Sequence, residues 1–155
     1  MAAAVHGVVR ASLDADAVVP LQVREAQALR QSLIEAGYEA ALRTGDADDP
    51  IPGLLEVKDS HRNRVDLLIG LRGMDPDLLD RTLQVRLAEA VLEIVGREDF
   101  IAMKAFAGGP VDLADARAVI DQHRESIDVQ LLRRLAERFG RETVKVVEDL
   151  IGVTD

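Results

Sequence analysis

The alternation of apolar and polar side chains predicts strands in the first two thirds of the chain. Residues 12–19 alternate with a period of two, and Pro20 stops the run. Further strands are expected over four ranges: 38–42, 54–58, 63–69 and 88–95. The second and third of these are joined by four polar residues, 59–62, and should form a hairpin.

Helical periodicity predicts the remaining elements. An amphipathic helix over 21–36 should end at Gly37, and a short helix over 77–83 has Asp75 as a candidate cap. Residues 1–9 have the pattern of a helix end. Four more helices are expected near the C-terminus, over 99–107, 112–123, 129–139 and 142–151. The sequence therefore predicts an α+β fold, with one domain over 1–155, a sheet core at about 10–95 and a helical part at about 98–152.

Composition fits a globular cytoplasmic protein. The 155 residues are 48% hydrophobic and only 3% aromatic, so the core should consist of Leu, Val, Ile and Ala. The absence of Cys excludes disulfides, thiolate zinc sites and cysteine nucleophiles. The chain has no apolar run of membrane-spanning length and no secretory signal pattern, so no membrane partner is expected.

Charge argues against a broad nucleic-acid-binding surface. The chain carries 28 acidic and 19 basic residues, a formal net charge of −9. This balance suits a protein that binds a metal–nucleotide complex or a basic partner. The three histidines are scattered, which excludes a histidine zinc cluster, and they are expected to be surface or capping residues: His6, His61 and His123.

Two acidic residues in the first predicted strand are the main candidates for chemistry. Asp14 and Asp16 point to one face of the strand, although strands are depleted in Asp. Their repulsion calls for a positive charge, and carboxylate oxygens suit Mg²⁺ or Mn²⁺. Asp66, in the apolar run over 64–69, would supply a third carboxylate if its strand lay beside the first. The alternative is a solvated strand face.

Several segments resemble the DNA polymerase β-like nucleotidyltransferases, in the abortive-infection, type IV toxin-like branch. The run HGVVRASLDAD at 6–16 resembles the family's His-Gly-x-x-Arg-x-Thr-x-Asp-hydrophobic-Asp segment, and 65–67 resembles its third carboxylate strand. Residues 99–107 resemble the branch's "Glu-Asp-Leu-Ile-Ala-Met-Lys" helix, and 112–115 resemble the acidic pair that follows it. The matched segments keep the family's order from about His6 to Ile120.

The resemblance implies a mixed sheet flanked by helices and a metal-dependent transfer reaction. A nucleoside monophosphate would pass from an NTP to a hydroxyl of RNA, protein or a small molecule. Asp14 and Asp16 would hold Mg²⁺ or Mn²⁺, and Asp66 would complete the site and help to deprotonate the acceptor. Three residues would contact the nucleotide: Arg10, Ser12 and Lys104. The alternatives are a Lys104 that only extends from a core helix and an Arg10 that pairs with the acids.

Departures from the family pattern support other interpretations. Relatives carry a glycine pair before the first helix that cradles the triphosphate, and in this chain it would fall before Met1. Val111 stands where the family often has Arg, and capping already explains Asp112 and Asp115. The chain could therefore be a catalytically degenerate module that binds nucleotide, a protein partner or an antitoxin, or an α+β domain with solvated acids. Apolar side chains of the last two helices suffice for a homodimer seam, or for core packing.

Overall fold

The computed structural model describes residues 1–8, 15–46 and 48–152. The chain divides into two compact units. Ala11–Arg72 forms one, called here the sheet unit. Met1–Arg10 together with Gly73–Asp155 forms the other, called the helical unit.

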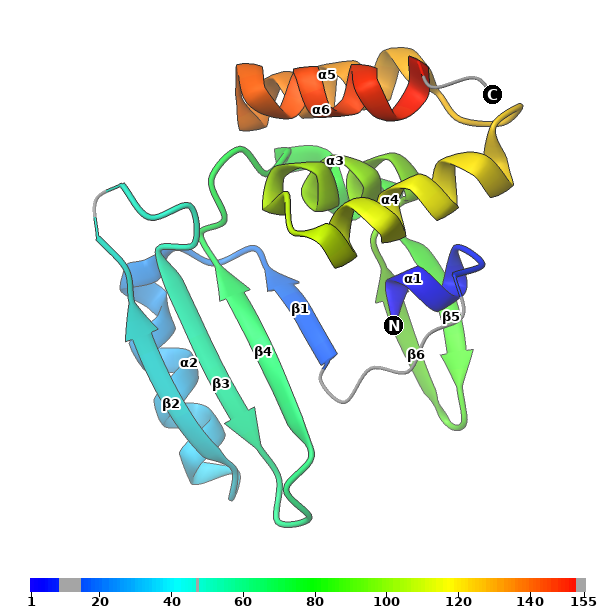
Figure 1. The fold of residues 1–155 in the computed structure, drawn as a ribbon. Coiled ribbons are helices and arrows are strands. Elements are labelled where there is room, and N and C mark those ends of the chain that lie inside the picture. Colours follow the sequence, from blue (N-terminus) through cyan, green and yellow to red (C-terminus); the bar gives the residue numbers. More distant parts are fainter. Residues whose placement is uncertain (9–14, 47, 153–155) are drawn as a thin grey trace. The chain divides into compact units, whose positions relative to one another are not determined.

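The sheet unit contains four strands and one described helix (Figure 1). Its elements are β1 (Ala15–Val19), α2 (Val23–Glu35), β2 (Glu39–Thr44), β3 (Gly53–Lys58) and β4 (Arg64–Ile69). The strand order is β1-β4-β3-β2, with β1 parallel to β4 and the other neighbours antiparallel. The predicted hairpin is confirmed as β3–β4. The first predicted strand is confirmed over 15–19, and its residues 12–14 lie outside the described residues.

Alternation along the strands places one face of the sheet against α2. Leu55 and Ile69 are fully buried there against Ala26 of α2, and Val57 is 8% exposed. A capping box opens the helix, because the Gln22 N–H donates to Glu25 Oε2 (2.8 Å). Since α2 is the one helix described in this unit, the opposite face of the sheet receives no helix from its own unit.

The helical unit builds a second core from five α-helices. Its elements are α1 (Ala2–Val5), a 3₁₀ helix η1 (Pro76–Arg81), β5 (Leu83–Leu87), β6 (Ala90–Ile94), α3 (Arg97–Ala107), α4 (Pro110–His123), α5 (Val129–Phe139) and α6 (Arg141–Gly152). Ile101 of α3, Leu132 of α5 and Val147 of α6 are all fully buried in this core. The apolar side chains of α5 and α6 therefore pack into the core of this unit. Across the described residues, every helix is too short or too polar to span a bilayer.

The predicted fold class is confirmed as mixed α+β with a helical C-terminal end, and two local predictions need comment. Strand β5 was not expected; it pairs antiparallel with β6, the predicted strand over 88–95. His6 was expected at the surface or in a cap, but its side chain is only 4% exposed. Its Nε2 lies 2.9 Å from the carbonyl oxygen of Val95. Burial lowers the pKa of His6, because it disfavours the charged imidazolium.

Candidate functional site

Three carboxylates occupy one line across the sheet unit. Asp16 of β1 is the register partner of Asp66 of β4, which is in turn the register partner of Glu56 of β3. Register partners point to the same face, and this face is opposite the one covered by α2. We call Asp16, Asp66 and Glu56 the acid row. The expectation that the strand of Asp66 would lie beside the strand of Asp16 is confirmed, with the two strands parallel.

Two basic residues, which lie two positions along β3 and β4 on the same face, neutralise part of the charge of the acid row. Arg64 and Lys58 are register partners on β4 and β3. Arg64 binds Asp66 through two hydrogen bonds, Nε–Oδ1 at 2.8 Å and Nη2–Oδ2 at 2.6 Å, and its Nη2 lies 3.1 Å from Glu56 Oε2. Lys58 Nζ lies 2.7 Å from Glu56 Oε1. The hydrogen bond from Lys58, aided by the charge of Arg64, lowers the pKa of Glu56, so this carboxyl group stays ionised.

The three carboxylates of the acid row differ in whether a cationic side chain balances their charge. Glu56 and Asp66 each have a cationic partner, whereas Asp16 is exposed at the β1 end of the row. Carboxylate oxygens on adjacent strands are suitable donors for a hard divalent cation. Among the described residues no group of three potential metal ligands is found, and both oxygens of Asp66 already accept hydrogen bonds from Arg64. A cation bridging Asp16 and Asp66 would therefore compete with the Arg64 guanidinium.

Of the other predicted site residues, three lie outside the described residues and one belongs to the helical unit. Arg10, Ser12 and Asp14 lie outside the described residues. Lys104 lies on α3, in the helical unit, where its Nζ is 2.5 Å from Asp112 Oδ1 and 3.6 Å from Asp115 Oδ2. The same Nζ lies 5.8 Å from the centre of the Phe100 ring. Lys104 is thus engaged within its own unit by the two acids of α4.

The alternation of residues in the hairpin could have indicated that Glu56, Lys58 and Arg64 share a face with Asp66. The residues that alternate with Glu56 and Lys58 are Leu55 and Val57, both buried against α2. In a hairpin, charged residues that alternate with buried apolar ones share the opposite face with their cross-strand partners. The basic Arg64 is two residues from Asp66, so this face had to carry both charges. Predictions based on the acidic residues alone therefore missed Lys58 and Arg64, which neutralise them.

Asp99, at the start of the helix that carries the family resemblance, has a structural partner. Its carboxylate is 3% exposed and accepts two hydrogen bonds from Arg81, from Nε at 2.8 Å and from Nη2 at 2.7 Å. Arg81 also reaches Asp75, the N-cap of η1, at 3.2 Å. The hydrogen bonds that Arg81 donates to Asp99 raise the pKa of Arg81, so its guanidinium stays charged. The pair therefore links η1 to α3 within the helical unit.

Comparison with known proteins adds no relative, since no family model and no curated protein matches the chain.

Proposed function

We propose that the chain is a Mg²⁺- or Mn²⁺-dependent nucleotidyltransferase-like protein that transfers a nucleoside monophosphate from an NTP to a hydroxyl group. The observation that supports this most directly is the pairing of Asp16 with Asp66 on adjacent parallel strands. Two carboxylates at one register position, on a face that α2 leaves uncovered, suit a divalent cation that carries a polyphosphate. The acceptor would be RNA, a protein or a small molecule.

In this proposal the described residues have separate roles. Asp16 and Asp66 would hold the cation, and Asp66 would also accept the proton of the attacking hydroxyl. A bound Mg²⁺ or Mn²⁺ supplies neutralisation of charge on the phosphates and lowers the pKa of the acceptor hydroxyl. Arg64 would release Asp66 when the cation binds and remain close to Glu56. Asp14 stays a candidate ligand of the cation, and Arg10, Ser12 and Lys104 stay candidates for nucleotide contacts.

The second candidate is a catalytically degenerate module of the same kind, and the position of Arg64 favours it. The guanidinium holds both oxygens of Asp66 and lies 3.1 Å from Glu56, so two of the three carboxylates already have a counter-charge. Such a sheet face is stable without a divalent cation. The protein would then bind nucleotide without turnover, or act through a protein partner or antitoxin.

Thermal stability in the presence of each NTP, with and without Mg²⁺ or Mn²⁺, tests the first candidate. A ligand that binds only the folded protein raises the melting temperature by mass action. We expect a metal-dependent increase with at least one NTP, and we expect Asp16→Asn and Asp66→Asn each to abolish it. Asp80→Asn, which changes an exposed acid of η1, is the matched control and should leave the increase intact.

Arg64→Gln separates the two candidates. If the acid row binds a divalent cation, removing the competing guanidinium should lower the metal concentration needed for the NTP effect. If the row only needs a counter-charge, the same substitution should lower the melting temperature, and metal should not restore it. A wild-type protein that responds to no NTP with either metal would contradict the transferase proposal.

A further inference from the structure

Strand β2 is an edge of the four-stranded sheet, and on one side of it none of the described strands is its neighbour. On its other side, the Gly45 N–H donates to Pro52 O (3.0 Å), in register with the β2–β3 ladder. Backbone groups alternate sides along a strand, so those of Ala40, Leu42 and Thr44 point to the free side. Arg30 Nε donates to the Ala40 carbonyl oxygen (3.1 Å), consistent with this direction. An open edge of this kind can template the addition of another strand.

A second copy of β2 can be placed along this edge in an antiparallel register centred on Ala41. When the two-fold axis passes beside Ala41, Ala40 lies opposite Leu42 of the second copy, and both present their N–H and C=O groups. The same register places Ala41 opposite its own counterpart, at a pair that makes no hydrogen bonds and where the strands approach most closely. The small side chain of Ala41 suits that position.

The charged side chains of β2 are complementary in this register. Glu39 and Arg43 are exposed and lie on the face opposite α2, since Ala40 and Leu42 pack on the α2 side. Glu39 of each copy would lie directly opposite Arg43 of the other, which gives two symmetric ion pairs. Within the part of the chain that the structure describes, neither residue lies within salt-bridge distance of an opposite charge. Lys58 is nevertheless the register partner of Glu39, and the charge of Arg43 helps to lower the pKa of Glu56.

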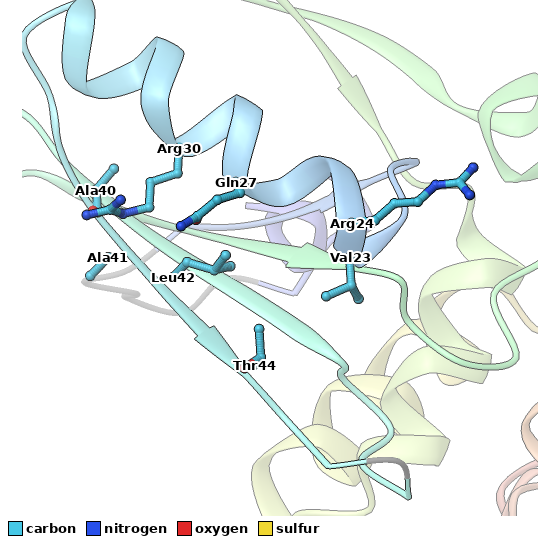
Figure 2. Close-up of a pocket in the computed structure, with 8 residues that line it drawn as sticks. All are labelled: Val23, Arg24, Gln27, Arg30, Ala40, Ala41, Leu42 and Thr44. Atoms are coloured by element: carbon cyan, nitrogen blue, oxygen red, sulfur yellow. The ribbon is translucent and has the colours of Figure 1, made fainter.

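Exposed apolar side chains and a groove accompany the same edge. Ile34 near the end of α2 is 38% exposed, and Tyr38 just before β2 is 43% exposed. Between α2 and β2 lies a groove of about 740 Å³, shown in Figure 2. Its lining residues are Val23, Arg24, Gln27, Arg30, Ala40, Ala41, Leu42 and Thr44. A second copy paired along β2 would adjoin this groove, because four of the residues that line it belong to β2.

We propose that the chain forms a two-fold symmetric dimer in which β2 pairs antiparallel with β2 of a second copy. The two four-stranded sheets then form one continuous sheet, in which the outward N–H and C=O groups of β2 pair across the two-fold axis and the Ala40 carbonyl oxygen accepts from the second copy as well as from Arg30. The interface uses neither the acid row nor a nucleotide. The dimer proposal can therefore be tested independently of the transferase proposal.

Sedimentation velocity and light scattering, over a concentration series of the full chain, test the dimer. We expect the wild-type protein to dimerise, and we expect Arg43→Glu and Glu39→Arg each to weaken dimerisation at least about tenfold by placing like charges opposite each other. An equimolar mixture of the two variants should form a one-to-one heterodimer, because each introduced charge then faces its opposite. Recovery in the mixture also shows that both variants are folded.

Two further variants complete the experiment. Arg86→Glu reverses an exposed arginine of β5 and should leave the dimer unchanged. Thr44→Pro removes an N–H from the free side of β2 and keeps the β2–β3 ladder, so it should weaken dimerisation without unfolding the sheet. A wild-type protein that stays monomeric at high micromolar concentration would overturn the proposal. A dimer that resists both charge reversals would also overturn it, because its interface would lie elsewhere.

Discussion

The environment of an ion pair, more than its geometry, should determine how much it contributes to the stability of this protein. Arg81–Asp99 and Arg133–Glu148 are both two-point contacts, with distances of 2.7–2.8 Å and 2.6–2.9 Å. Asp99 is only 3% exposed, whereas the side chains of the second pair are 49% and 42% exposed. A buried carboxylate that loses its partner has no water to replace it. An exposed pair exchanges each partner for solvent with little change in free energy.

We expect Arg81→Ala to lower the free energy of unfolding by about 3 kcal/mol, because it leaves Asp99 buried and unpaired. The matched substitution Arg133→Ala should change the stability much less. Urea unfolding followed by circular dichroism measures both. Equal effects of the two substitutions would show that the burial of Asp99 is not what makes its pair important.

At the level of single elements, local sequence signals such as caps, turns and periodicity predicted most helices and the hairpin. They did not predict the pairing of strands that are distant in the sequence. Asp75 caps η1 as expected, accepting a hydrogen bond from the Asp77 N–H at 2.9 Å. Strand β5 was missed although Leu83, Val85 and Leu87 alternate with polar residues, because the run is only five residues long and its first residue was assigned to the preceding helix; its pairing with β6 makes it a strand. The parallel β1–β4 pairing likewise depends on the whole fold, since no turn joins these strands.

The end of α3 depends on the conformation of one glycine. Gly108 is its C-cap, with φ +68°, and its N–H donates to Lys104 O at 3.1 Å. A Cβ atom there would meet no atom closer than 3.8 Å, so the left-handed backbone is the main obstacle to a side chain. We expect Gly108→Ala to lower the free energy of unfolding by about 1 kcal/mol. Gly152→Ala, at a helical glycine with open space around it, should not destabilise, and thermal unfolding compares the two.

For the whole molecule, the sequence predicted the acids of the candidate site better than their surroundings. The strand of Asp66 was considered as a neighbour of the strand of Asp16 because a third carboxylate beside the first two would complete a metal site. The row continues to Glu56 and is neutralised by Arg64, which follows only from the cross-strand register. The partition of the chain was also not visible, because the helical unit draws on both ends of the sequence. No composition shift or linker marks that division.

Because each unit buries its own set of apolar side chains, a cavity in one core should act mainly on that unit. Leu55 is fully buried in the sheet unit, and Leu132 is fully buried in the helical unit. We expect Leu55→Ala to lower local stability by about 3 kcal/mol and to speed amide hydrogen exchange within 15–72. Leu132→Ala should speed exchange in α3, α5 and α6 instead. Mass spectrometry of exchanged peptides distinguishes these patterns, and faster exchange throughout the chain in both variants would mean that the two cores unfold as one cooperative domain, as the sequence alone suggested.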